Sequence, residues 1–470
     1  MIIKRDRDII KCYFEDESGL RGGYAESAFL PENEENAISI LKDATNNKTP
    51  LTISGGGTGV TGARVPFGGS ILATDSLNKI INIDEKKLFA TLEPGVRLSD
   101  LEKELSGKNL IYPPDPTEPN AFLGGTISTN ASGVKGFKYG PTRGYIKRLK
   151  IALPSGDILD IKRGQYFVNK GDKFTLPGNK KIKINIPTYN MPAIKSSAGY
   201  YVKDKMDLID LFIGQEGTLA FILEADIALG KKPEGIMSFF SFFPTEDDAL
   251  NFVKEAKTLN ALSLEYMDEN SLNLLRVKYP NLGKSSKALI YFEQDFQKQE
   301  EQSLTDSWTK ILERHNALMD ASYFADSDKE REKLKEFRHA LPEMINEIVK
   351  RNKLPKVGTD IAVPAKSFKE MFLFYKEKLL HSKIEFVIFG HIGESHMHVN
   401  MLPDKEETFK KSRGIYMDFV KKAVSLGGTV SAEHGIGKLK HAFLEAMFGK
   451  DALKEMAQLK KSLDPACILG

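Results

Sequence analysis

The sequence predicts an α+β protein with a domain boundary near residue 230, on three observations. The chain has 470 residues, enough for about two or three domains that each bury a core. Residues 31–229 alternate short apolar segments with turns rich in Gly, Pro and Asn, the pattern of β-strands. After residue 230, strand patterns alternate instead with long charged helical segments, which we expect at about 297–317 and 328–351.

Two short segments predict helices that pack by one face. In "ENAISILKDAT", Ala37, Ile40 and Leu41 recur at helical spacing. In the second region, "IMSFFSFFP" predicts a strand, and Thr245 is expected to cap the helix "EDDALNFVKEAKTL". The apolar face of that helix consists of Ala249, Phe252, Val253 and Ala256. The tail "KHAFLEAMFGKDALKEMAQLKKSL" is also predicted to be helical.

Composition excludes several classes of protein. The net charge of +3 is small for this length and charges of both signs are interspersed, which argues against nucleic-acid binding. Neither Cys12 nor Cys467 belongs to a CxxC, so no thiolate zinc site, iron–sulfur cluster or disulfide framework is expected. The first residues lack a signal-peptide pattern, and the most apolar windows are too short to cross a bilayer. We expect a cytoplasmic protein, with peripheral membrane contact left open.

The glycine-rich segment "ISGGGTGVTG" (53–62) contains a GxGxxG spacing but does not predict a Rossmann unit. That unit needs a crossover helix directly after the third glycine. Pro66, Gly68 and Gly69 forbid such a helix, and the next strand, "ILATD", follows at once. The segment instead predicts a loop between two strands, whose backbone N–H groups can surround a phosphate.

Two further segments predict polar loops of the same kind. The segment "YPPDPTEPNAFLGGTISTNASG" (112–133) joins a stiff proline stretch to a glycine turn and small hydroxyl and amide residues. Such residues suit a flat polar ligand that lies against the backbone. The segment "IGQEGTLAFI" (213–222) offers a turn followed by a strand. Three loops of this type predict a large nucleotide cofactor.

These segments, together with "GPTRGY", resemble the FAD-binding domain of the vanillyl-alcohol oxidase / p-cresol methylhydroxylase flavoprotein superfamily. The resemblance implies a two-subdomain FAD-binding domain of the p-cresol methylhydroxylase type at 1–230, with its core at 30–229. It implies an α+β substrate or cap domain with an antiparallel sheet at 231–425. A C-terminal helical segment at 426–470 would carry a Glu-His motif and pack back toward the flavin. No His or Cys occurs from residue 13 to residue 314, so we expect non-covalent FAD.

The resemblance also implies which residues contact FAD. The diphosphate would lie on Gly55, Gly56, Gly57, Thr58 and Gly59. The path from adenosine to isoalloxazine would be lined by Pro114, Asp115, Gly125, Ser128, Thr129 and Asn130. Glu216 and Gly217 would lie near the adenine end.

Four of the eight histidines lie in two glycine-rich segments, "FGHIGESHMHVN" and "GGTVSAEHGIG". A strand through "HMHVN" would place His396 and His398 on one face, unless it begins at Met397. His391 lies on the preceding turn and could fold back toward His398. Two imidazoles and a carboxylate with an open position are a recurring ligand set for catalytic zinc and related metals. Scattered structural histidines remain the alternative at this point.

These two segments resemble the D-2-hydroxy acid dehydrogenase branch of the superfamily, which includes D-lactate, D-2-hydroxyglutarate and glycolate enzymes. The resemblance implies that His391, His398 and Glu433 bind a divalent metal, zinc by preference, and that His434 is the catalytic base. The sequence departs from the branch at "ESH", where His396 replaces a small amide and either adds a ligand or alters the pocket.

The predicted function is FAD-dependent oxidation of a D-2-hydroxy acid (lactate, glycolate or 2-hydroxyglutarate) to the 2-oxo acid. The resemblance implies that Arg338, in "KEFRHALPEM", binds the substrate carboxylate, as the aligned arginine does in relatives, and Lys356 is a second candidate. Electrons would pass to a quinone, an electron-transfer protein or a partner subunit, and a homodimer is compatible with the sequence. Two alternatives stay open: a metal hydrolase that uses His391, His398 and Glu433, and a flavin-binding subunit without oxidase chemistry of its own.

Overall fold

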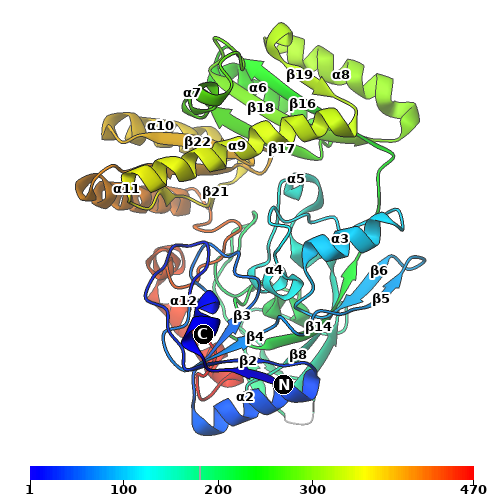
Figure 1. Cartoon of the computed structure of the whole chain (residues 1–470), viewed down its shortest axis with the longest axis vertical. Coiled ribbons are helices and arrows are strands. Elements are labelled where there is room, and N and C mark those ends of the chain that lie inside the picture. The colour runs from blue at the N-terminus through cyan, green and yellow to red at the C-terminus, as the bar shows by residue number, and fades with distance from the viewer. Residues whose placement is uncertain (179–180) are drawn as a thin grey trace. The chain divides into compact units, whose positions relative to one another are not determined.

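The computed structural model describes residues 1–178 and 181–470, and the chain forms two compact units (Figure 1). The first unit consists of three chain segments, Met1–Gly133, Pro141–Lys231 and Ser431–Gly470. The second consists of Val134–Gly140 and Lys232–Val430. Both units combine sheets with helices, so the predicted α+β class is confirmed.

A four-stranded sheet carries the glycine-rich loop of the first unit. Its order is β1 (Ile2–Lys4), β2 (Ser27–Leu30), β4 (Ser70–Ala73) and β3 (Leu51–Ser54), with β2, β4 and β3 parallel. Helix α2 (Glu34–Asn47) buries Ala37, Ile40 and Leu41 against this sheet, as predicted. Residues 55–69, all described, contain no helix between β3 and β4, so the exclusion of a Rossmann unit is confirmed.

A five-stranded antiparallel sheet forms the other part of the first unit. Its order is β5 (Ile80–Asp84), β6 (Phe89–Leu92), β14 (Phe221–Ala228), β8 (Ile146–Ala152) and β9 (Ile158–Lys162). Helices α3 (Leu98–Ser106) and α4 (Leu123–Thr129) pack into its core. The remaining elements are short: α1 (Arg7–Ile10), β7 (Leu110–Ile111) with β15 (Gly230–Lys231), β10 (Phe167–Val168) with β13 (Met206–Asp207), and β11 (Lys173–Thr175) with β12 (Lys183–Asn185).

Helix α4 corrects the sequence-based interpretation of the second polar loop. The glycine turn predicted there is the first turn of a helix, in which Leu123 and Ile127 are buried. A Cβ on Gly124 would lie 2.6 Å from the Cβ of Pro94. Glycine is therefore required here for close packing of a helix, and not for a turn.

The C-terminal segment returns to the first unit and lies beside β3. Helix α12 (His441–Leu463) confirms the predicted helical tail, with a break at Gly449, whose φ is 78°. Beyond it, the N–H of Leu51 donates to the carbonyl of Ile468 at 2.6 Å, and Thr52 Oγ1 donates to the carbonyl of Gly470 at 3.1 Å.

The second unit is built on an eight-stranded antiparallel sheet. Its order is β19 (Tyr323–Ala325), β16 (Gly235–Phe243), β18 (Ala288–Phe296), β17 (Ser263–Asp268), β22 (Phe386–Gly390), β23 (His396–Met401) and β20 (Val357–Gly358), with β21 (Ile361–Ala362) also paired to β23. The strand predicted in "IMSFFSFFP" is β16. This order places β17 beside β22, which in turn pairs with β23.

Helices cover this sheet, and Figure 1 shows the long helix α9 (Asp328–Asn352) lying across it. Thr245 caps α6 (Glu246–Ala256) by accepting the N–H of Asp248 at 3.1 Å, and the predicted apolar face of α6 is buried. Trp308 packs its ring on that of Phe292, with centroids 4.5 Å apart. The other helices are α5 (Gly136–Tyr139), α7 (Glu269–Lys278), α8 (Glu301–Arg314), α10 (Phe368–Ser382) and α11 (Glu406–Ser425).

In the part of the chain that the structure describes, no helix combines the length and the apolarity needed to cross a membrane.

Candidate functional site

A cavity of about 290 Å³ in the first unit is lined by the glycine-rich loop. Most of the predicted cofactor residues line it: Gly55, Gly56, Gly57, Thr58, Gly59, Gly125, Ser128, Thr129, Glu216 and Gly217. Among the described residues, Pro114, Asp115 and Asn130 are not part of its wall. Asn130 instead ends α4 in the left-handed conformation, and its side chain accepts the N–H of Arg143 at 3.0 Å.

Backbone hydrogen bonds join the second and third polar segments into one wall. The N–H of Gly214 donates to Ile127 O at 2.9 Å, and the N–H of Glu216 donates to Ser128 O at 2.8 Å. The partly buried Arg143 guanidinium reinforces this wall by donating to Ile213 O at 2.6 Å. Burial lowers the pKa of Arg143 to about 10. Sequence reasoning missed this structural arginine, whose one signal is its place in the motif "GPTRGY".

The glycine loop is shaped by a second arginine that sequence reasoning missed. Gly57 has a φ of 81°, and a Cβ there would meet the guanidinium of Arg64. Arg64 donates to Gly55 O at 2.8 Å and to Glu15 O at 3.0 Å, and it lines the cavity. Burial lowers the pKa of Arg64. Open backbone and a guanidinium in one loop fit a diphosphate, so the cavity fits the expected FAD.

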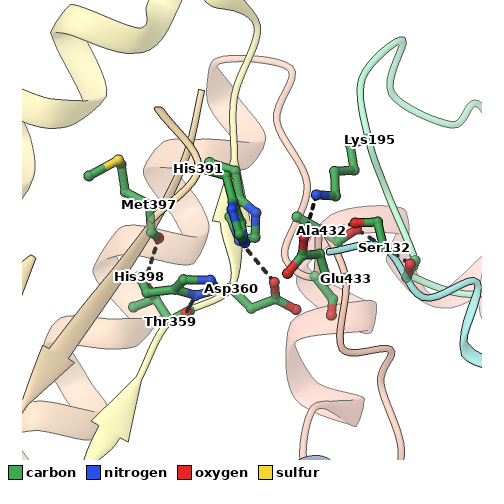
Figure 2. Close-up of polar contacts among 12 residues, drawn as sticks. Ser132, Lys195, Thr359, Asp360, His391, Met397, His398, Ala432 and Glu433 are labelled. Carbon is green, nitrogen blue, oxygen red and sulfur yellow. Dashed lines mark hydrogen bonds and ion pairs between the residues drawn. The ribbon is translucent and has the colours of Figure 1, made fainter. Parts of the chain in front are cut away.

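Glu433 and His434 also line this cavity. Figure 2 shows Lys195 and Ser132 directed at the Glu433 carboxylate; Ser132 Oγ donates at 2.8 Å, and Lys195 forms an ion pair with the same oxygen. The Lys195 and Glu433 side chains are only 7% and 9% exposed, so the pair is largely shielded from water. Thr61 Oγ1 donates to the His434 carbonyl at 3.3 Å, which ties the Glu-His motif to the glycine loop.

Glu216 holds the backbone that follows the Glu-His motif. Its carboxylate accepts the N–H groups of Ile436, at 3.0 Å, and Gly437, at 2.9 Å. A Cβ on Gly435, whose φ is 77°, would overlap this carboxylate. Burial raises the pKa of Glu216 to about 6, although the two N–H groups and Lys440 favour the charged form. The structure thus assigns Glu216 a contact with the segment that carries His434.

The second unit brings three histidines together. Strand β23 begins at His396, so the prediction that His396 and His398 share a face is confirmed, with ring centroids 4.5 Å apart. His391, on the turn after β22, folds back as predicted. The centroid of its ring lies 5.5 Å from that of His398 and 5.2 Å from that of His396. Each ring offers a nitrogen within 4.8 Å of the other two.

Each of these imidazoles has a carboxylate or carbonyl oxygen within 3.1 Å of a ring nitrogen. His391 Nδ1 lies 2.6 Å from Glu265 Oε1 on β17, and His396 Nε2 lies 3.1 Å from Asp360 Oδ1. His398 Nδ1 lies 3.1 Å from Thr359 O, a contact drawn in Figure 2. Metal-bound histidines usually donate their second ring N–H to a carboxylate or carbonyl, and the contacts of His391 and His398 match this arrangement. The cluster therefore fits a divalent metal.

Arg338 and Lys356 lie in the same unit as the histidines. Arg338, on α9, places Nη2 3.4 Å from Glu265 Oε2, so one carboxylate joins Arg338 to His391. Lys356 precedes β20, which pairs with the histidine-bearing strand β23. Desolvation lowers the pKa of the Lys356 ammonium. Sequence reasoning missed Glu265 and Asp360, because neither lies near a histidine in the chain.

The predicted metal ligands come from both units. The second unit unites His391 and His398 with Arg338, whereas Glu433 and His434 line the cavity of the first unit. The roles of Glu433 as a metal ligand and of His434 as a base therefore stay predictions.

Comparison with known proteins assigns the family. The FAD binding domain family matches residues 25–162, and the family described as FAD linked oxidases, C-terminal domain, matches residues 232–470. The D-lactate dehydrogenase of Archaeoglobus fulgidus is 30% identical, over 94% of this chain and 89% of that protein. Glycolate oxidase subunit GlcD of Bacillus subtilis is 28% identical, over 95% of this chain and 88% of that protein.

A third relative and a solved structure extend the comparison. The D-2-hydroxyglutarate dehydrogenase of Stutzerimonas stutzeri is 27% identical, over 99% of this chain and 94% of that protein. A structure of alkyldihydroxyacetonephosphate synthase matches with a TM-score of 0.70 and 15% identity, over 99% of this chain and 81% of its own, which shows a shared fold. The chain belongs to the FAD-linked oxidase family, with an FAD-binding domain, and is an oxidoreductase.

Proposed function

We propose that this chain uses non-covalent FAD and a divalent metal to oxidise a D-2-hydroxy acid to the 2-oxo acid. The observation that carries the proposal is the group of three histidines joined through Glu265 to Arg338, in a chain of the FAD-linked oxidase family. The relatives are named for glycolate, D-lactate and D-2-hydroxyglutarate, which all bear a hydroxyl beside a carboxylate. The guanidinium of Arg338 suits the carboxylate, and a metal held by the neighbouring histidines suits the hydroxyl.

Arg338 binds the substrate carboxylate in this proposal. Its guanidinium can form two parallel hydrogen bonds to a carboxylate, and Glu265 restricts its orientation. Lys356 adds a second donor from the residue that precedes β20, the strand paired with β23. Both residues would thus orient the substrate with its C2 hydroxyl toward the histidines.

His391 and His398 would hold the metal, and Glu433 would complete the ligand set implied by the family resemblance. A bound divalent metal supplies Lewis acidity that lowers the pKa of the substrate hydroxyl. Zinc is the metal we propose, because imidazole nitrogen is among its preferred ligands. Lys195 and Ser132 hold the Glu433 carboxylate in place.

His434 accepts the proton of the C2 hydroxyl. Its position in the wall of the flavin cavity supports this role, since the proton and the C2 hydride must leave neighbouring atoms. Bound FAD supplies the acceptor for the hydride, so the substrate loses two electrons and two hydrogens in total. The electrons then pass to an external acceptor, for which we propose a quinone, an electron-transfer protein or a partner subunit.

The test is reduction of the flavin by a panel of 2-hydroxy acids. The FAD-loaded chain is mixed without oxygen with the D and L forms of lactate and 2-hydroxyglutarate and with glycolate, with and without added zinc or manganese. We expect bleaching of the flavin absorption by a D-2-hydroxy acid or glycolate, and turnover with a dye acceptor. A flavin that no 2-hydroxy acid reduces would overturn the proposal, as would a chain that takes up no FAD.

A further inference from the structure

The histidine segment of this chain carries one more imidazole than its family resemblance requires. In "GHIGESHMHVN", His396 stands where the resembling branch has a small amide. Its side chain is 0% exposed, and its Nε2 faces Asp360, which is 1% exposed. Burying an imidazole and a carboxylate together costs desolvation energy that a small amide or an apolar residue would avoid.

The neighbours of His396 indicate a function that would account for the desolvation energy of burying it. The other two rings of the cluster, at centroid distances of 4.5 Å and 5.2 Å, belong to His398 and His391. All three rings offer a nitrogen within 4.8 Å of one another, close enough to share one ion. A histidine that only filled the core would not need two other imidazoles at this distance.

The contacts with neighbouring oxygens indicate which ring nitrogen of His391 and of His398 carries the proton. Glu265 and the Thr359 carbonyl accept from Nδ1 of His391 and His398, which leaves Nε2 of each as a lone-pair donor. His396 is oriented differently, because its Nε2 is the nitrogen that lies near a carboxylate, 3.1 Å from Asp360 Oδ1. Each of the three rings therefore has a carboxylate or carbonyl oxygen within 3.1 Å of one of its nitrogens.

We propose that His396 is a third imidazole ligand of the metal, so that the second unit alone supplies three nitrogen ligands. The inference rests on the metal-dependent function proposed above and deepens it. A three-imidazole set favours zinc, cobalt, nickel, copper and ferrous iron over manganese and magnesium, which prefer oxygen ligands. It also makes metal binding less dependent on Glu433.

The test counts the imidazoles on the bound ion. The full FAD-loaded chain is stripped with a chelator and titrated with Co²⁺, followed by visible d–d absorption, and zinc X-ray absorption gives the number of histidine ligands. We expect three imidazoles on zinc in the unaltered chain and two in His396→Asn. We expect His396→Asn to weaken binding more than about tenfold, since even outer partners such as Asp360 are worth about 10–100-fold. Asp360→Asn should therefore weaken binding within that range.

His381→Asn is the matched control, because His381 is an exposed histidine on α10 of the same unit whose Nδ1 contacts the Glu377 carbonyl. It should leave affinity and spectrum unchanged. Two imidazoles on zinc in the unaltered chain would overturn the inference and leave the proposed function intact. Unchanged cobalt affinity in His396→Asn would do the same. A chain that binds no metal yet has its flavin reduced by a 2-hydroxy acid would overturn both the inference and the metal part of the proposed function.

Discussion

The flavin cavity of the first unit and the histidine cluster of the second are built in opposite ways. Backbone forms much of the cavity wall, through glycines at 55–57, 59, 125 and 217. The cluster consists of side chains held by other side chains, such as His391 by Glu265. We therefore expect the cavity to be sensitive to added atoms and altered φ, and the cluster to be sensitive to changes in charge and proton position. Substitutions in each region test this distinction.

The largest effect is expected at His434, a titratable residue in the wall of the backbone-built cavity. His434→Asn should lower kcat about 10²–10⁴-fold, the usual contribution of a general base, while the chain keeps its flavin. Stopped-flow measurement of flavin reduction separates this loss from slow reoxidation. His441→Asn, an exposed histidine on α12, is the control. A His434→Asn enzyme that reduces its flavin at the normal rate would remove the base from the mechanism.

The next effect is expected at Glu265, which contacts both His391 and Arg338. Glu265→Gln keeps the size but removes the charge, so metal affinity should fall about 10–100-fold, and flavin content should not change. Cobalt titration and flavin absorbance measure the two properties separately. Glu269→Gln, which alters a surface ion pair with Lys287, should change neither. Equal loss of flavin and metal would contradict the separation of the two regions.

Glu216 is expected to have a smaller effect, on how the free energy of unfolding depends on pH. The reason is that its pKa of about 6 in the folded protein lies above the ordinary 4.5. The folded state binds the proton more tightly than the unfolded state. This contribution to stability is therefore fully present below about pH 4.5 and is lost as pH rises through 6. The loss amounts to about 2 kcal/mol in the free energy of unfolding.

Glu216→Gln should remove this pH dependence, because a glutamine cannot titrate and its amide oxygen can still accept from Ile436 or Gly437. The measurement is the thermal midpoint of the FAD-loaded chain between pH 4.5 and 7, with Glu102→Gln on the surface of α3 as the control. If the variant and the unaltered chain lose stability in parallel across this range, Glu216 is not the group that titrates.

The smallest effect is expected in the glycine loop. Gly57→Ala places a Cβ against the guanidinium of Arg64. Gly57 also has a φ of 81°, a conformation that costs a residue other than glycine about 1–2 kcal/mol. FAD affinity should fall about tenfold, measured by fluorescence quenching with the stripped chain. Gly144→Ala has no heavy atom within 4 Å of the added carbon and should bind FAD normally. Metal affinity should be unchanged in both variants.

The sequence predicted elements whose causes are local. Helical spacing predicted both α2 and α6, and it also predicted which face of each helix is buried. Pro66 and the glycines beside it excluded a helix after the glycine loop. Alternation along β23 placed His396 and His398 on one face. These outcomes depend on residues within one or two turns or along one strand, which a sequence pattern records.

Partners far apart in the chain could not be predicted. Glu265 lies 126 residues from His391, and Lys195 lies 238 residues from Glu433, so no spacing rule connects them. Packing was equally hidden: Gly124 indicated a turn, whereas it lies in α4, where only glycine fits against Pro94. Side-chain contacts between distant segments depend on the tertiary fold, and one sequence without its fold does not record them.

The discontinuity of the first unit along the chain has a consequence for folding order. Its cavity needs Thr61 beside His434, 373 residues apart, and its sheet edge needs Thr52 beside Gly470, 418 residues apart. The second unit is largely one continuous segment, Lys232–Val430, inserted between parts of the first. Contacts so distant form slowly, because a long loop must close before they contribute. We infer that β17 acquires amide protection before β3 in pulse-labelled hydrogen exchange, and that flavin capture is the late step; earlier protection of β3 would reverse this order.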